Sequence, residues 1–144
     1  MELTKNEQRA LQIALEAHEG QKDKVDIPYV LHPIIVGLMG ENEAERVVGF
    51  LHDVVEDTNV TFEDLEKEFD KEIIDALKLL THDKKESYWT YIDRIANSSN
   101  AIAKAVKISD LTHNILRGLE ARIDQSKHIK AYRALTGLYF NINP

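Results

Sequence analysis

The sequence contains no cysteine, so disulfide bridges and thiolate metal ligands are both excluded. Any bound metal ion would have to be held by histidine, aspartate and glutamate side chains. Long apolar runs are also missing, since none approaches the roughly 20 residues that a membrane-spanning helix requires. The charged, amphipathic N-terminus lacks the pattern of a secretion signal. We therefore expect a cytoplasmic protein with no membrane segment.

Positive charge is scarce, because 18 Lys and Arg residues stand against 25 Asp and Glu residues and give a formal net charge of −7. Most of such a surface repels a polyanion, which argues against binding to a nucleic acid polymer. A small phosphorylated ligand needs only one locally positive pocket, and a divalent cation can supply much of that charge. The composition is therefore compatible with a small nucleotide partner.

The pattern that is present is helical. Apolar residues recur at three- and four-residue intervals, and an alternation with period two is nowhere sustained. A chain of 144 residues suits a single core, so we predict one all-α domain over residues 1–144. Breakers and caps divide it into about seven or eight helices. These are expected near residues 4–19, 31–40, 43–56, 62–69, 71–81, 87–97, 100–117 and 120–140.

Several local signals mark helix ends. Thr61 with Asp64 three residues later has the spacing of a capping box. Ser98, Ser99 and Asn100 are all candidate caps for the helix at 100–117, and Gly118 is expected to end that helix.

The stretch LHDVVEDT at 51–58 places strong polar groups inside an apolar helical pattern. On a continuous helix, His52 and Glu56 share one face, and Asp53 and Asp57 share the neighbouring face. Carboxylates packed this closely beside apolar residues carry a cost of desolvation and of like-charge repulsion. A divalent cation bound there would compensate for that cost. The alternative is that these residues form a solvated acidic helix face, where no such cost arises.

Two further residues could complete a metal site. His32 follows Pro28 at the expected start of a helix, and Asp110 lies in the middle of an apolar helical run. Together with His52 and Asp53 they offer two imidazoles and two carboxylates, a set better suited to manganese, iron or zinc than to a calcium cage of oxygen atoms. The alternative for Asp110 is an interior ion pair with Lys107 or Arg117.

Four motifs, in this order, resemble the hydrolase domain of Rel/Spo-type alarmone enzymes, which are part of the HD-domain superfamily of metal-dependent phosphohydrolases. They are HxxQ at 18–21, PYVLHP at 28–33, LHDVVEDT at 51–58 and VKISDLTHN at 106–114. The resemblance implies an HD-domain helical bundle that removes the 3′-pyrophosphate from guanosine tetra- and pentaphosphate, (p)ppGpp. It also implies a divalent metal ion, Mn²⁺ first, with Fe²⁺, Zn²⁺ or Mg²⁺ as alternatives.

The resemblance also assigns roles. Four residues match the family's metal ligands: His32, His52, Asp53 and Asp110. Glu56 and Asp57 match the catalytic pair that positions and deprotonates the attacking water, a role that suits a carboxylate beside a metal ion. Asn114 falls where the family contacts its substrate, and Lys24 falls at a basic position near the phosphates.

The substrate-binding part departs from the family. Asp23 takes the position of an arginine that packs on guanine, Asp26 takes that of a glycine, and Ile-Leu-Arg follows Asn114 where the family tends to continue with Arg-Thr. Replacing an arginine by a carboxylate removes a cation–π contact and adds repulsion toward phosphate. Two alternatives follow: an HD phosphohydrolase of another nucleotide or phosphoester, and a non-catalytic nucleotide-binding HD module.

Other polar and aromatic residues are expected to have ordinary roles. We predict that four histidines are structural or surface residues: His18, His82, His113 and His128. The aromatic cluster at 88–92 is interpreted as core packing, with Arg94 near it. The last apolar run, 135–144, would either close the core or form the contact of a homo-oligomer.

Overall fold

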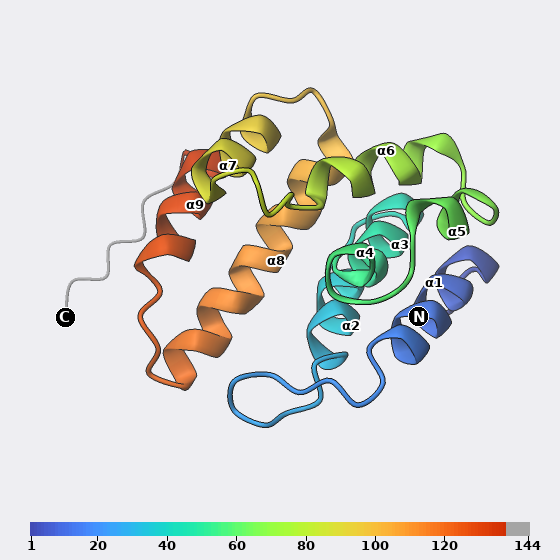
Figure 1. Cartoon of the computed structure of the whole chain (residues 1–144), viewed down its shortest axis with the longest axis horizontal. Coiled ribbons are helices and arrows are strands. Elements are labelled where there is room, and N and C mark those ends of the chain that lie inside the picture. The colour runs from blue at the N-terminus through green and yellow to red at the C-terminus, as the bar shows by residue number, and fades with distance from the viewer. Residues whose placement is uncertain (138–144) are drawn as a thin grey trace.

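Nine helices form the regular structure of residues 1–137, the part of the chain that the computed structural model describes (Figure 1). They are α1 (Lys5–Ala17), α2 (Leu31–Leu38), α3 (Glu43–Leu51), α4 (Val54–Asp57), α5 (Phe62–Glu66), α6 (Lys71–Leu80), α7 (Tyr88–Ala96), α8 (Ala101–Glu120) and α9 (Ser126–Thr136). These residues contain no strand, only an isolated bridge between Lys22 and Pro28. The all-α prediction is confirmed.

The extra helix arises because the segment expected at 43–56 is split. Helix α3 ends at Leu51, a turn holds His52 and Asp53, and α4 adds one further turn. The His52 Nδ1–H donates to the Gly49 carbonyl at 2.7 Å, and in a continuous helix that carbonyl would accept the Asp53 amide. A side chain that occupies the backbone acceptor ends the helix at the functional residues.

The prediction that Gly118 ends the long helix is wrong. Helix α8 continues to Glu120 and closes with Arg122 at φ 58°, while the Ile123 N–H donates back to the Gly118 carbonyl at 2.8 Å. Gly118 serves close packing instead, because a Cβ there would lie 1.9 Å from the Gln125 side-chain nitrogen. Because α8 extends to Glu120 and a turn follows it, the last helix begins at residue 126 rather than 120. The predicted end of that helix, at residue 140, lies outside the described residues.

The predicted capping signals largely hold. Thr61 and Asp64 form the expected capping box at the start of α5. Among the three candidate caps for α8, Asn100 is the one that accepts a hydrogen bond, from the Ala103 amide. These caps could be predicted from the sequence because a capping side chain bonds to a backbone group only three residues away.

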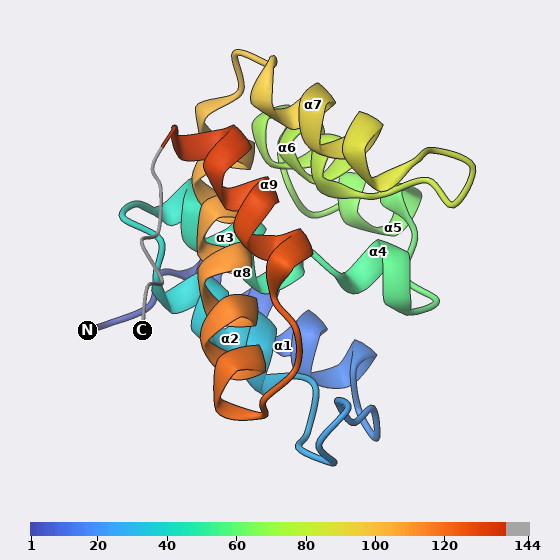
Figure 2. The ribbon, with the colours of Figure 1, turned by 90° about the vertical axis from the view of Figure 1, so that its left-hand side faces the viewer.

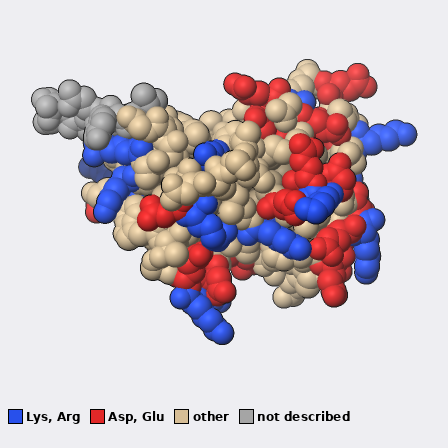
Figure 3. Space-filling view, turned by 90° about the horizontal axis from the view of Figure 1, so that it is seen from above, with Lys and Arg blue, Asp and Glu red and all other residues tan. Residues whose placement is uncertain are grey.

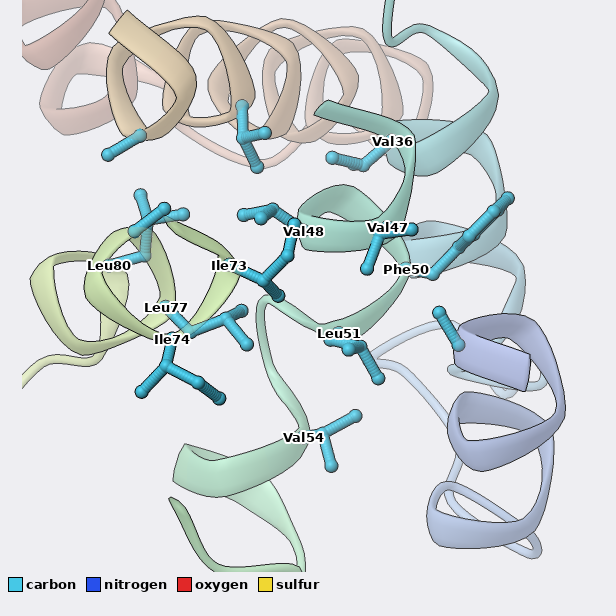
Figure 4. Close-up of a cluster of buried hydrophobic side chains, with 14 of the residues drawn as sticks. Val36, Val47, Val48, Phe50, Leu51, Val54, Ile73, Ile74, Leu77 and Leu80 are labelled. Carbon is cyan, nitrogen blue, oxygen red and sulfur yellow. The ribbon is translucent and has the colours of Figure 1, made fainter. Parts of the chain in front are cut away.

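The core lies between α1, α2, α3, α6 and α8 (Figure 4). Phe50 and Leu51 are fully buried, and each such side chain contributes about 1.5–3 kcal/mol. Gly37 and Gly49 face each other, because a Cβ at Gly49 would lie 2.7 Å from the Gly37 Cα. This glycine contact brings α2 and α3 together, and the two histidines of the candidate metal site lie in α2 and directly after α3.

Helix α8 runs through the middle of the bundle, with α2 and α3 along one part of it and α9 along another (Figures 1 and 2). In the view of Figure 3, Asp and Glu crowd the end of the molecule formed by α1 and α5, and fewer acidic residues lie near α9. The negative charge of the chain is therefore unevenly spread. Every helix within residues 1–137 is too short or too polar to cross a lipid bilayer.

Candidate metal centre

Two buried histidines face each other across the contact between α2 and the end of α3. His32 lies in the first turn of α2 and is 1% exposed, while His52 directly follows α3 and is 5% exposed. Their ring centroids are 5.2 Å apart and their planes are nearly perpendicular, at 74°. The helix contact therefore places two imidazole groups side by side in the protein interior.

Two aspartates converge on the same imidazole nitrogens. Asp110 Oδ1 lies 2.8 Å from His32 Nε2 and 3.4 Å from His52 Nε2. Asp53 Oδ2 lies 3.0 Å from His52 Nε2 and 3.8 Å from His32 Nε2. Side chains from three distant parts of the sequence thus meet at one point, as the prediction requires.

The tautomer of His52 tests whether a metal ion fits there. Its Nδ1 must carry hydrogen because it donates to the Gly49 carbonyl, so a neutral ring has its lone pair on Nε2. That Nε2 is buried without a hydrogen-bond partner and points toward Asp53 and Asp110. A lone pair facing two carboxylates is unfavourable unless a proton or a metal ion lies between them. The donor set of two nitrogens and two carboxylates fits a divalent metal ion.

The electrostatics of the cluster also favour a cation. Burial opposes protonation of His52, but the charges of Asp53 and Asp110 raise its pKa well above the ordinary value. Burial likewise opposes the charged form of Asp53, yet His52 lowers the pKa of this carboxyl to about 2. The carboxylates thus stay ionised, and a metal ion would compete with one proton for the position at Nε2.

Lys107 binds the far side of Asp110. Its Nζ lies 2.7 Å from Asp110 Oδ2 and 5.1 Å from the centre of the Tyr91 ring. Burial disfavours the charged forms of both groups, but the Lys107 charge lowers the pKa of Asp110 well below its usual range. The ion pair that the sequence offered as an alternative for Asp110 is therefore present. It occupies the other carboxylate oxygen, so Oδ1 still faces the histidines.

Glu56 and Asp57 form a second acidic group beside this cluster. Ligand oxygens of Asp53, Glu56 and Asp57 all lie within 4.8 Å of one another. Burial, Asp53 and Glu56 raise the pKa of Asp57 to about 6, and burial raises the pKa of Glu56 too. The backbone N–H of His82 donates to Glu56 Oε1 at 2.7 Å and so fixes the orientation of that carboxylate.

Residues of the first two motifs hold the acidic turn in place. The Tyr29 hydroxyl donates to Asp53 Oδ2, and the Gln21 side-chain amide donates to the Asp57 carbonyl at 2.9 Å. Gln21 is in turn bonded to His18, which is 1% exposed. The structural role predicted for His18 therefore serves the site, because it anchors the residue that holds α4.

Two pockets adjoin the centre. The smaller, of about 200 Å³, has polar walls that include Asp53, Glu56, Lys107 and Lys127. The larger, of about 500 Å³, lies between the segment at 22–29, the end of α8 and the start of α9. Lys127 lines both pockets, so one cationic side chain lies between the acidic cluster and the larger pocket.

The two predicted substrate-binding residues both line the larger pocket. Lys24 is exposed there. The Asn114 amide donates to Asp110 Oδ1 at 3.0 Å, and its oxygen accepts from Arg117. Asn114 therefore contacts a predicted metal ligand as well as the pocket.

Asp23 has a specific place in the larger pocket. Its carboxylate accepts the backbone N–H groups of Val25 and Ile27, and Arg117 Nη1 lies 3.6 Å from it. Those amides and Arg117 outweigh partial burial and lower the Asp23 pKa. The repulsion expected from this carboxylate is thus reduced, because an arginine from α8 stands opposite it.

Sequence reasoning missed several residues that border the site. They are Tyr29, His82, His113 and Lys127. His113 lies 2.7 Å from His32, Nδ1 to Nδ1, although 81 residues separate the two in the chain. Burial, His32 and Arg117 lower the pKa of His113 to about 4, so its ring is neutral at neutral pH. The signal that could have revealed it is its spacing of three residues from Asp110, which puts both on one face of α8.

The all-α fold, with two histidines and two aspartates meeting between its central helices, fits the class of HD-type domains. No family model matches the chain. Related proteins do match it. The guanosine-3′,5′-bis(diphosphate) 3′-pyrophosphohydrolase of Borreliella burgdorferi is 36% identical over 115 residues, which cover 74% of this chain and 16% of that protein. The bifunctional (p)ppGpp synthase/hydrolase SpoT of Escherichia coli is 30% identical over 134 residues, 84% of this chain and 19% of that protein.

A solved structure matches over almost the whole chain. It is a metazoan ortholog of SpoT that hydrolyses ppGpp and plays a role in starvation responses, with a TM-score of 0.79 and 28% identity over 98% of this chain and 91% of that one. The chain is thus a homologue of the (p)ppGpp 3′-pyrophosphohydrolases, and the resemblance seen in its four motifs is confirmed. It spans less than a fifth of the length of the two curated relatives.

Proposed function

We propose that this chain is a metal-dependent phosphohydrolase that removes the 3′-pyrophosphate from (p)ppGpp, with Mn²⁺ at His32, His52, Asp53 and Asp110. The observation that carries the proposal is the convergence of these four side chains beside Glu56 and Asp57. A cytoplasmic location and a single domain over residues 1–144 belong to the proposal. A homo-oligomer stays a prediction.

The bound ion would supply a Lewis acid that makes a water molecule more acidic and neutralises charge on phosphoryl oxygens. The protein's own part begins with Glu56, whose carboxylate is held by the His82 amide and faces the smaller pocket. The pKa values of Glu56 and Asp57 are raised, so they lie closer to neutral pH than the pKa values of ordinary carboxyl groups. Groups with such pKa values are effective acceptors for the proton of an attacking water.

Cationic residues supply the charge for a polyphosphate. Lys127 lies between the two pockets, and Lys24 and Arg117 line the larger one. In this arrangement the phosphates to be cleaved lie by the acidic cluster, where the ion balances the carboxylates, and the rest of the nucleotide occupies the larger pocket. A chain with a net charge of −7 can bind such a substrate because the cations are local.

The test is a substrate panel with purified protein and Mn²⁺. We expect release of pyrophosphate from ppGpp, no release of phosphate from simple mononucleotides, and loss of activity in chelator. Cleavage of mononucleotides with equal efficiency would favour the second candidate, an HD phosphohydrolase of another nucleotide or phosphoester. Asp23 facing Arg117 in the larger pocket is the observation that keeps this candidate open. Metal binding without hydrolysis of any substrate would favour the non-catalytic module.

A further inference from the structure

His32 is held at both of its ring nitrogens by the same helix. Its Nε2 lies 2.8 Å from Asp110 Oδ1, and its Nδ1 lies 2.7 Å from His113 Nδ1. Asp110 and His113 are three residues apart on α8, so they project from one face of that helix. Helix α8 therefore fixes the rotation of an imidazole that belongs to α2.

Two imidazole nitrogens at this distance must share one hydrogen, so one donates and the other accepts. A histidine that binds a metal ion through Nε2 uses the lone pair there and, when neutral, carries its hydrogen on Nδ1. In the described part of the chain, the hydrogen-bond partner of that Nδ1 is His113. His113 must then accept through Nδ1 and carry its own hydrogen on Nε2.

We propose that His113 is a positioning residue of the metal centre, which accepts the Nδ1–H of His32 and thereby directs the His32 lone pair toward Asp53 and Asp110. Metal-binding histidines commonly donate their second N–H to a carboxylate or a carbonyl. Here the acceptor is a neutral imidazole, which orients the ring without adding another negative charge to the acidic cluster. This inference rests on the proposed metal-dependent function.

A purely structural role is the competing explanation, because the two rings are nearly parallel, at 13°, with centroids 5.0 Å apart. Two substitutions separate the explanations. His113→Phe keeps a flat ring between α2 and α8 but removes the acceptor. His113→Asn loses the ring but places an oxygen acceptor close to the former position of Nδ1.

The experiment measures Mn²⁺ affinity of the purified full chain by calorimetry, without substrate. We expect His113→Phe to weaken Mn²⁺ binding about 10- to 100-fold, the usual loss when such a supporting group is removed. His113→Asn should stay close to the wild type. The matched control is His128→Phe, another partly buried histidine, whose Nδ1 faces Gln125 and no predicted metal ligand, and its Mn²⁺ affinity should be unchanged. Wild-type affinity in His113→Phe, or equal losses in the Phe and Asn variants, would overturn the inference.

A second measurement needs no variant and covers the case in which His113→Phe fails to fold. Long-range ¹H–¹⁵N spectra of Zn²⁺-loaded wild-type protein report the tautomer of each imidazole. We expect His32 with hydrogen on Nδ1 and His113 with hydrogen on Nε2. An Nδ1–H tautomer of His113 would overturn the inference while leaving the metal site intact, whereas failure of the wild type to bind either ion would contradict the proposed function itself.

Discussion

At the scale of single residues, His52 links the backbone to the site. Its Nδ1 occupies the Gly49 carbonyl, which ends α3 and also leaves Nε2 directed at two carboxylates. One hydrogen bond thus determines both where the helix stops and which nitrogen is free for a metal ion. The residues could be selected from the sequence because polar groups interrupt an apolar pattern there. The break in the helix could not be predicted from the sequence, because it depends on the conformation of the His52 side chain.

The position of His113 likewise cannot be predicted from the sequence, which indicates only an ordinary structural or surface role for this residue. Its partner is 81 positions away in the sequence, and only the packing of α2 against α8 brings the two rings together. Lys107 was identified as a possible partner of Asp110 because it lies three residues away on the same helix. Contacts within one helix turn can be predicted from spacing, and contacts between helices require the fold.

Glu56 gives the first residue-scale prediction. Glu56→Gln keeps the shape of the side chain but cannot accept a proton, so turnover of ppGpp should fall about 100-fold or more. Mn²⁺ affinity should change little, because Glu56 is not one of the four predicted ligands. Steady-state kinetics and calorimetry on the same preparation test both parts. Turnover that is unaffected would remove Glu56 from the catalytic role.

Asp57 gives a prediction about pH. Its pKa in the folded protein is about 6, above the ordinary 3.8, so folding favours the protonated form and the ionised form costs stability above pH 6. Asp57→Asn removes that cost. Metal-free Asp57→Asn should therefore be more stable than the wild type at neutral pH, by on the order of 1 kcal/mol, because solvent screens this exposed side chain.

The difference between Asp57→Asn and the wild type should shrink as pH falls from about 6 toward 3.8, where both proteins carry a neutral side chain. Urea unfolding in chelator at neutral and acidic pH measures it. A difference that stays constant with pH would show that the Asp57 charge is not its cause.

At the scale of elements, the glycine contact between α2 and α3 determines how closely the two histidines approach. Alanine normally stabilises a helix relative to glycine by about 1 kcal/mol. At Gly49 we expect the opposite, because its Cβ would lie 2.7 Å from the Gly37 Cα and 3.0 Å from the Val36 carbonyl oxygen. Gly49→Ala should destabilise the fold by about 1–3 kcal/mol, the usual cost of overpacking.

The same substitution should weaken Mn²⁺ binding, because it pushes α2, which carries His32, away from the end of α3. Chemical denaturation and calorimetry give the two quantities. An increase in stability on Gly49→Ala would mean that α2 and α3 do not pack through this contact.

Most helices were predictable from their periodicity and caps, but their ends were less so. Gly118 is a residue type that commonly ends a helix, yet it lies inside α8 against the Gln125 side chain. Arg122 adopts the left-handed conformation instead. Glycine is common at the left-handed position that follows a helix, but this preference is only statistical. Here that position is Arg122, and packing requires the glycine four residues earlier, at Gly118. The predicted start of the last helix was displaced for the same reason.

At the scale of the whole molecule, acidic residues are unevenly distributed over the bundle. Acidic residues gather at the end formed by α1 and α5, whereas Lys and Arg have fewer acidic residues beside them near α9 (Figure 3). The net charge of −7 argues against a polyanion spread over the surface, but it conceals the cations around the two pockets. Their gathering requires the return of α9 onto α7 and α8, which no local pattern reveals.

The most direct test of the central claim is a calorimetric titration of the metal-free protein with Mn²⁺, in wild type and in Asp53→Ala and Asp110→Ala. Convergence of two imidazoles and two carboxylates on one point predicts that the wild type binds a single ion and that each substitution abolishes this binding. A wild type that binds no divalent ion, or variants that bind Mn²⁺ as tightly as the wild type, would contradict it.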